Sequence, residues 1–356
     1  MSEQWVDRTK PIREGEAFEL DKLLKYVMNN ICGLKGKAKI EQFPGGHSNL
    51  TYLLRVGDRE LVVRRPPFGR KAKGAHNMKR EYQIMKALKP VFPYCPEPLA
   101  CTEDESIIGC PFYIMERIGG IILRRDPPEG LDFSREAARK LCEKLIDVHL
   151  ELHALDYRKI GLEGFGKPDG YVKRQLNGWS DRYRAARTTD APDFEAVMTW
   201  LEELLPPECG AAVIHNDYRF DNVVLDPSDP MKIIGVLDWE MATVGDPLMD
   251  LGGSLAYWVD RTDAAEMQAI RLVPTHLEGM FSRKEVVGYY AQRAGIKVDN
   301  FDYYYVFGLF RLAVIAQQIY YRFFHGQTKD ERFGRLIFAV HILEKQAKAV
   351  MKQSNL

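Results

Sequence analysis

The sequence predicts an α+β protein in which a β-rich amino-terminal part is followed by a larger helical part. Short alternating apolar runs dominate the chain up to about residue 118, and apolar residues at helical spacing dominate the remainder. One small β insert interrupts the helical part at 211–240. We therefore expect an amino-terminal lobe over residues 1–118 and a carboxy-terminal lobe over residues 119–356.

Four segments define the amino-terminal part. Apolar residues recur at helical spacing over residues 15–31 and again over residues 75–89, where basic residues occupy the opposite side. Two extended runs at 51–64 flank Gly57-Asp58, which indicates a hairpin. A second hairpin is predicted over residues 97–117, with its turn near residues 104–106.

The carboxy-terminal part is mostly helical in pattern. A long helix is predicted over residues 134–154, with Ser134 as its N-cap, and further helices over residues 179–205 and 285–350. The insert contains short apolar runs separated by Asp, Asn and Pro. These runs predict strands at 211–214, 223–225 and 233–237.

Composition excludes several classes of protein. The chain has 356 residues, of which 46% are hydrophobic, and its 50 basic and 50 acidic residues cancel. A cancelled net charge argues against a nucleic-acid coat or a membrane-surface binder. No apolar run approaches the roughly 20 residues of a membrane span, and the polar start does not resemble a signal peptide. The six cysteines form no C-x-x-C pair, so we expect a cytoplasmic protein with free thiols. Because of the cancelled charge and the lack of a long apolar run, we expect neither nucleic acid nor membrane as a partner.

The insert carries the residues that best suit a chemical reaction. A short apolar run leads to Asp217 and, five positions later, to Asn222; the last strand of the insert ends on Asp238. Mg²⁺ prefers hard oxygen ligands, and it usually takes one or two protein groups together with phosphate oxygens. We expect Asn222 and Asp238 to hold Mg²⁺, which leaves Asp217 to accept the proton of an attacking hydroxyl.

These spacings match the D-x-x-x-x-N of kinase catalytic loops with a later metal-binding Asp. The run His215–Asn222, then Asp-Trp-Glu at 238–240, Gly-Asp-Pro at 245–247 and Asp250, resembles the aminoglycoside phosphotransferase and choline kinase-like family. The resemblance is closest to the kinase-like domains associated with acyl-CoA dehydrogenases. The chain departs from the usual H-G-D by carrying Asn216. It lacks the D-F-G and A-P-E of protein kinases, which disfavours a polypeptide acceptor.

The resemblance implies a protein-kinase-like two-lobe fold, ATP as the phosphoryl donor and Mg²⁺ as the metal. It gives Asp217 the role of catalytic base and makes His215 a brace for the loop, with Asp246 and Asp250 as architectural residues. Arg219 stands where many kinases carry a lysine that touches the transferred phosphate. An ordinary solvent-exposed arginine is the alternative for this position.

The amino-terminal lobe is then expected to bind the nucleotide. Residues 43–51 include two glycines and polar donors, Ser48 and Asn49 among them, and resemble the phosphate-covering loop of the family. Arg64 stands where most kinases have lysine and should pair with Glu81 on the following helix. Arg65 is the alternative, because only one of two successive strand residues faces a given side.

Two further assignments are positional. Residues 115–118 resemble the interlobe hinge, where backbone groups of Glu116 and Ile118 would read the adenine edge. His149 and His153 are spaced i and i+4 on a predicted helix and could hold a metal. No zinc pattern completes the pair, so we favour a hydrogen-bonded packing role.

The sequence therefore predicts a small-molecule kinase. Its acceptor is a hydroxyl-bearing small molecule, and the resemblance favours a hydroxy acid or its CoA thioester over an aminoglycoside. The alternative from another class is a nucleotide-binding pseudokinase or interaction module, motivated by Arg64 in the lysine position. The oligomeric state is not predicted.

Overall fold

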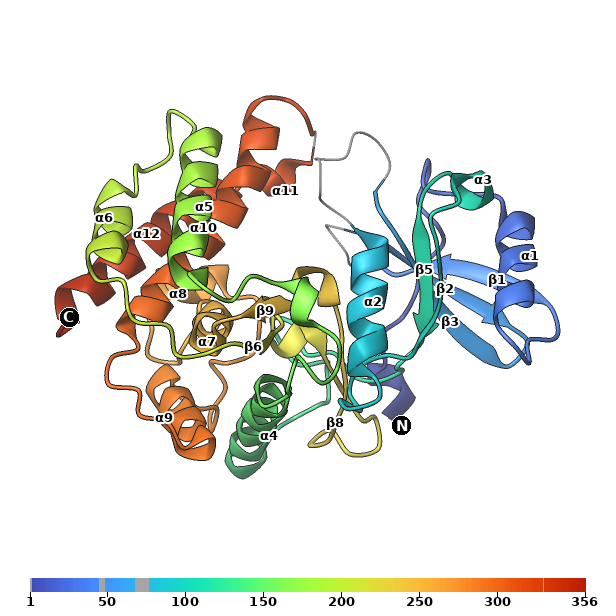
Figure 1. Cartoon of the computed structure of the whole chain (residues 1–356), viewed down its shortest axis with the longest axis horizontal. Coiled ribbons are helices and arrows are strands. Elements are labelled where there is room, and N and C mark those ends of the chain that lie inside the picture. The colour runs from blue at the N-terminus through green and yellow to red at the C-terminus, as the bar shows by residue number, and fades with distance from the viewer. Residues whose placement is uncertain (1, 45–48, 68–76, 329) are drawn as a thin grey trace. The chain divides into compact units, whose positions relative to one another are not determined.

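The computed structural model describes residues 2–44, 49–67, 77–328 and 330–356. The chain forms two compact units. The first unit contains Met1–Ile122 and Asn222–Ala242, and the second contains Leu123–Asp221 and Thr243–Leu356. The first unit is rich in strands and the second is mainly helical (Figure 1), as predicted for an α+β chain. Residues 222–242 belong to the first unit, although residues 123–221, which precede them, belong to the second.

A five-stranded antiparallel sheet forms the centre of the first unit. Its strands follow the order β1-β2-β3-β5-β4. Their bounds are Ala38–Gln42 for β1, Leu50–Val56 for β2, Arg59–Arg65 for β3, Pro98–Thr102 for β4 and Phe112–Glu116 for β5. The predicted hairpin at 51–64 is confirmed as β2–β3, in which Tyr52 pairs with Val63.

Helices cover the two faces of this sheet. α1 (Leu20–Asn30) buries Leu23 and Val27 against one face, where it meets alternate side chains of the strands such as Val63 and Ile114. α2 (Met78–Leu88) lies on the other side of the sheet (Figure 1). Because strand side chains alternate, Arg64 points to the α2 face while Val63 points to the α1 face.

A small hairpin ties residues 222–242 to the first unit. It consists of β7 (Val223–Leu225) and β8 (Ile233–Val236). Leu225 exchanges backbone hydrogen bonds with Ile121, at 2.9 and 2.8 Å. A side chain at Gly120 would place its Cβ 2.3 Å from the carbonyl oxygen of Leu225, so only glycine permits this close approach.

The second unit packs around the long helix α10 (Asp302–Phe324), which contacts α5, α6, α7 and α12. The other helices and strands of this unit are α4 (Arg135–His153), α5 (Tyr171–Ala186), α6 (Glu195–Glu203), β6 (Ala212–Ile214), β9 (Thr243–Gly245), α7 (Pro247–Leu255), α8 (Ala265–Ile270), α9 (Arg283–Ala294), α11 (Glu331–Gly334) and α12 (Leu336–Gln353). α7 and α10 touch through glycines: a Cβ at Gly252 would lie 2.3 Å from the Tyr304 carbonyl oxygen. The remaining elements are α3 (Glu105–Ile108) and four 3₁₀ turns at Ser2–Trp5, Glu163–Phe165, Phe220–Asn222 and Trp239–Met241.

Several boundaries differ from the predictions. The first helix begins at Leu20 rather than near residue 15, and the turn of the second hairpin contains α3. The stretch predicted to be helical over residues 179–205 contains α5 and α6, but the break between them at residues 187–194 was not predicted. Pro192 lies in this break, and Phe194 adopts a positive φ of 55°.

The structure bears on the expectations for the cysteines and for membrane-spanning helices. All six cysteines are free thiols, as predicted. Within the described ranges, every helix is too short or too polar to cross a membrane. The predicted cytoplasmic location stays a prediction.

Candidate active site

A buried ion pair joins the central sheet of the first unit to α2. Arg64 Nη1 lies 3.1 Å from Glu81 Oε1, and the side chains are 8% and 2% exposed. The hydroxyl of Tyr113 on β5 donates to the same Glu81 oxygen at 2.7 Å. Arg65 faces the other way and donates to the carbonyl oxygens of Pro66 and Ile108. Of the two arginines considered, Arg64 is therefore the one that pairs with Glu81.

Arg64 also binds the carboxylate that follows β8. Its Nη2 donates to Asp238 Oδ1 at 2.9 Å and lies 3.8 Å from Glu240 Oε2. Burial opposes the charge of Arg64, yet Asp238, then Glu81, hold the pKa of the guanidinium well above its ordinary value. Asp238 has a positive φ of 66°, a conformation that side-chain-bearing residues rarely adopt and that is often found at functional sites.

The β7–β8 hairpin places the two predicted metal ligands at one end. Val223 pairs with Val236, and the next backbone bond runs from Leu237 N–H to the Asn222 carbonyl oxygen at 2.8 Å. Asn222 and Asp238 thus flank neighbouring strand ends. Their amide and carboxylate oxygens are ligands that suit Mg²⁺.

Glu240 is a residue that the sequence reasoning missed. Its Oε2 accepts a hydrogen bond at 2.7 Å from Asn49, which begins the described chain after the glycine-rich segment. The Asp-Trp-Glu motif contributes to the resemblance to the family, but no sequence signal links it to Asn49, 191 residues earlier. Ser48, the other residue predicted in this loop, lies outside the described residues.

The predicted hinge residues lie where β5 leaves the sheet. The backbone N–H of Glu116 donates to the Glu97 carbonyl oxygen at 2.9 Å, and its side chain accepts from Lys89 at 2.8 Å. The role predicted for Glu116 and Ile118 in adenine recognition stays a prediction. The Ile118 side chain packs on Gly235, where an added Cβ would approach it to 2.8 Å.

In the second unit, Asp250 on α7 holds the start of the segment His215–Asn222, for which the sequence predicts the catalytic role and which we name the catalytic segment. Its Oδ2 accepts from His215 N at 2.8 Å and its Oδ1 from Asn216 N at 2.7 Å, while Arg311 donates to the Asn216 carbonyl oxygen at 2.6 Å. Asn216 has φ of 64°, which glycine and asparagine adopt most readily. This explains why asparagine can stand where the family usually has glycine. The bracing role predicted for Asp250 is confirmed.

Asp217 follows in the same segment. Its backbone N–H lies 3.2 Å from His215 Nδ1, so His215 braces the loop as predicted. Arg219 Nε lies 3.3 Å from Asp217 Oδ1 and 3.1 Å from Asp221 Oδ1, and its guanidinium lies over the Tyr257 ring at 4.3 Å. The side chain of Arg219 is 19% exposed, which excludes an ordinary exposed arginine.

The two histidines of α4 meet Asp250 from the other side. His149 Nε2 and His153 Nε2 lie 3.0 and 3.1 Å from Asp250 Oδ2, and His153 Nδ1 lies 2.8 Å from the Tyr290 hydroxyl. A ring lone pair facing a carboxylate would be repelled, so Nε2 of both rings carries hydrogen. Burial alone would raise the pKa of Asp250, but the bonds from the two histidines hold it well below its ordinary value.

This arrangement decides between the two interpretations of the histidine pair. His149, His153 and Asp250 have the composition of a metal site. However, the two Asp250 oxygens already accept from both histidines and from two backbone N–H groups. A carboxylate normally accepts about four hydrogen bonds, so this one is saturated. The predicted packing role is confirmed.

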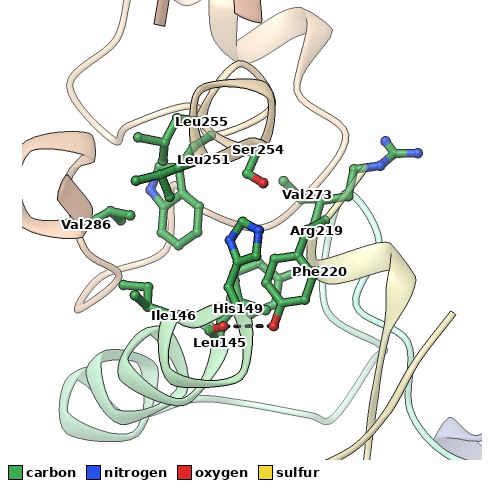
Figure 2. Close-up of a pocket in the computed structure, with 12 residues that line it drawn as sticks. Leu145, Ile146, His149, Arg219, Phe220, Leu251, Ser254, Leu255, Val273 and Val286 are labelled. Carbon is green, nitrogen blue, oxygen red and sulfur yellow. Dashed lines mark hydrogen bonds between the residues drawn. The ribbon is translucent and has the colours of Figure 1, made fainter. Parts of the chain in front are cut away.

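A small apolar cavity lies beside His149 (Figure 2). Its volume is about 20 Å³, and the lining residues include Leu145, Ile146, Leu251, Leu255, Val273 and Val286. The His149 ring stacks on Tyr218 of the catalytic segment at 4.2 Å, and the Tyr218 hydroxyl donates to the Leu145 carbonyl oxygen at 2.8 Å. Arg219 points away from the cavity (Figure 2). The cavity therefore belongs to the packing beneath the loop.

The fold is that of the kinase-like phosphotransferases. The sequence model of the Phosphotransferase enzyme family matches residues 39–278. The chain belongs to this family.

The chain is also similar to individual proteins and solved structures. Acyl-CoA dehydrogenase family member 10 of Mus musculus is 36% identical over 329 residues, which cover 91% of this chain but 30% of the mouse protein. The crystal structure of a candidate aminoglycoside phosphotransferase from Ralstonia eutropha has a TM-score of 0.81 at 28% identity and covers 96% of this chain and 100% of that one. Choline kinase from Cryptosporidium parvum shares the fold, with a TM-score of 0.63 at 11% identity and coverage of 94% and 96%.

Proposed function

We propose that this chain transfers the γ-phosphate of ATP to a hydroxyl group of a small molecule, with Mg²⁺ as its metal. The observation that carries the proposal is the position of Arg64, a buried cation held between Glu81 of α2 and Asp238 after β8. Membership of the phosphotransferase family supports the reaction type. The resemblance to the family supports ATP as the donor, and the oxygen ligands that Asn222 and Asp238 offer support Mg²⁺ as the metal.

The first unit would bind the nucleotide. Arg64 would contact the α- and β-phosphates, Ser48 and Asn49 would cover them, and backbone groups of Glu116 and Ile118 would meet the adenine. Among the described residues, Arg64 Nε and Glu81 Oε2 are buried without a hydrogen-bond partner. Buried polar atoms without a partner are costly, and they are expected where a ligand completes a site.

The donor set at the end of the β7–β8 hairpin fits a magnesium ion. Asn222 and Asp238 offer an amide and a carboxylate oxygen, and the Asp238 side chain is 32% exposed, so a cation can reach it from solvent. When bound, Mg²⁺ would neutralise the charge that develops on the transferred phosphate. Glu240, two residues on, adds negative charge nearby.

The second unit would supply the base. Asp217 would orient the acceptor hydroxyl and take its proton while the hydroxyl oxygen bonds to the γ-phosphorus. The bond between that phosphorus and the bridging oxygen breaks, and ADP leaves with the bond electrons. Arg219, beside Asp217, would contact the transferred phosphate.

A hydroxy acid or its CoA thioester is the proposed acceptor. Relatives that share this region are named for acyl-CoA dehydrogenases, and this chain spans 30% of the length of the mouse protein. The sequence shows no dense acidic cluster of the kind that would suit a polycationic aminoglycoside.

The test compares Asp217→Asn with Asp132→Asn, an exposed aspartate of the same unit. With the preferred hydroxy acid or thioester and Mg-ATP, we expect Asp217→Asn to lower kcat by about 100-fold or more, since general bases contribute at least that much. Binding of Mg-ATP, measured by calorimetry, should be retained. Full activity of Asp217→Asn would refute the assignment of the base. ATP binding without acceptor-dependent turnover in the unmodified protein would favour the pseudokinase alternative.

A further inference from the structure

Arg64 holds two carboxylates at the same time. Its Nη1 lies 3.1 Å from Glu81 and its Nη2 lies 2.9 Å from Asp238, so separate amino groups of one guanidinium serve the two partners. Dissolved salt screens this ion pair only weakly, because the Arg64 and Glu81 side chains are buried, with 8% and 2% of their surfaces exposed. Asp238, the proposed metal ligand, is therefore already bound to a cation of the protein.

The side chain at this position matters for that double contact. An arginine presents a planar fork of donors, whereas a lysine presents one compact ammonium group. The neighbouring Arg65 shows that a buried arginine alone does not produce the contact, since it binds carbonyl oxygens of Pro66 and Ile108. The double contact is therefore a property of Arg64.

We propose that Arg64 competes with a divalent cation for Asp238, so that the nucleotide-free protein binds metal weakly and nucleotide binding releases the carboxylate for the metal. The inference rests on the proposed function, in which Asp238 is a metal ligand and Arg64 meets the phosphates. Phosphate oxygens would replace Asp238 as the partner of Nη2. Metal binding and nucleotide binding then support each other.

Charge accounting gives the direction of the effect. The carboxylates of Glu81, Asp238 and Glu240 surround one guanidinium, which leaves a formal charge of −2 when all are ionised. Removal of the guanidinium charge leaves −3 and takes away the contact between Arg64 and Asp238. A metal ion alone should then bind more tightly, while ATP, which loses a cation, should bind more weakly.

The experiment measures both affinities on the full chain. Binding of Mn²⁺ without nucleotide is followed by the loss of the free-ion electron paramagnetic resonance signal, and binding of ATP in EDTA is followed by calorimetry. For Arg64→Met we expect Mn²⁺ to bind at least about tenfold tighter and ATP about tenfold weaker. Arg65→Met is the matched control, a buried arginine on the next residue of β3, and should leave Mn²⁺ affinity unchanged.

Opposite shifts of the two ligands separate this inference from a general loss of structure, which would weaken both. If Arg64→Met does not fold, the double variant Arg64→Met/Glu81→Gln removes the buried unpaired carboxylate. Its formal charge stays at −2, so the gain in Mn²⁺ affinity should be smaller than in Arg64→Met and should come only from the loss of the contact between the guanidinium and Asp238. Unchanged or weaker Mn²⁺ binding in the folded variant would overturn the inference. When Asp238→Asn is added to Arg64→Met, the gain in Mn²⁺ affinity should be abolished. If Asp238→Asn leaves metal binding with and without ATP unchanged, the proposed metal site itself is refuted.

Discussion

Replacement of Asp250 by asparagine is the most informative perturbation of the catalytic segment. The Asp250 side chain is fully buried, and its oxygens accept from His149, His153 and the backbone N–H groups of His215 and Asn216. A carboxamide has the same shape but offers one acceptor oxygen and one amino group. The change therefore tests the hydrogen bonds and the charge without creating a cavity.

The structure sets the size of the expected loss. The amide would best place its amino group at the Oδ1 position, where Asn216 N–H alone donates among the described contacts. That donor is left buried and unpaired, at about 1–3 kcal/mol. The donors at Oδ2 keep an oxygen but lose its negative charge, at about 1 kcal/mol each. We expect Asp250→Asn to lower the free energy of unfolding by about 4–6 kcal/mol, a large part of the stability of a typical domain.

Urea unfolding followed by circular dichroism measures this loss, with Asp132→Asn as the exposed control. The control should unfold within about 0.5 kcal/mol of the original protein. A loss below about 2 kcal/mol for Asp250→Asn, with the control unchanged, would show that these hydrogen bonds do not hold the loop as the structure indicates.

Three further predictions concern stability. Burial, then the neighbouring His153, lower the pKa of His149 to about 4, so the unfolded chain takes up a proton there near pH 6.5 and the folded chain only near pH 4. The free energy of unfolding should therefore fall by about 3 kcal/mol as the pH drops through this window. The urea midpoint should fall between pH 7 and pH 4.5 in the original protein, and it should fall less in His149→Phe. Asn216→Gly should change stability by less than about 0.5 kcal/mol, whereas Asn216→Val should cost about 1–2 kcal/mol, because φ of 64° disfavours a β-branched residue; equal unfolding midpoints would contradict this. Gly252→Ala should lower the free energy of unfolding by about 3 kcal/mol, because its Cβ would meet the Tyr304 carbonyl oxygen at 2.3 Å. Thermal unfolding should show a lower midpoint for this variant and an unchanged midpoint for Gly164→Ala, whose Cβ would meet nothing within 4 Å.

Local patterns were sufficient to predict part of the fold and of the site. Strand alternation and an amphipathic helical pattern predicted the β2–β3 hairpin and α2, whereas the resemblance to kinases predicted the pairing of Arg64 with Glu81. Ser134 caps α4 by accepting from Ala137 N, as its position indicated. Such features depend on residues close in sequence, where periodicity and capping rules apply.

Contacts between distant segments were not predictable in this way. The bond between Arg64 and Asp238 spans 174 residues and that between Asn49 and Glu240 spans 191, and no local rule specifies either. The break between α5 and α6 was a different kind of failure. Pro192 and the polar residues before it carried a turn signal, which the helical composition on both sides outweighed.

Transfer of labelled phosphate from ATP to an acceptor is the direct test of the proposed reaction. The purified chain is incubated with Mg²⁺, γ-labelled ATP and hydroxy acids or their CoA thioesters, and the products are separated. We expect label in a phosphorylated acceptor, dependent on Asp217 and absent when Mg²⁺ is chelated. Label recovered only in ATP and inorganic phosphate, across the whole acceptor panel, would contradict it.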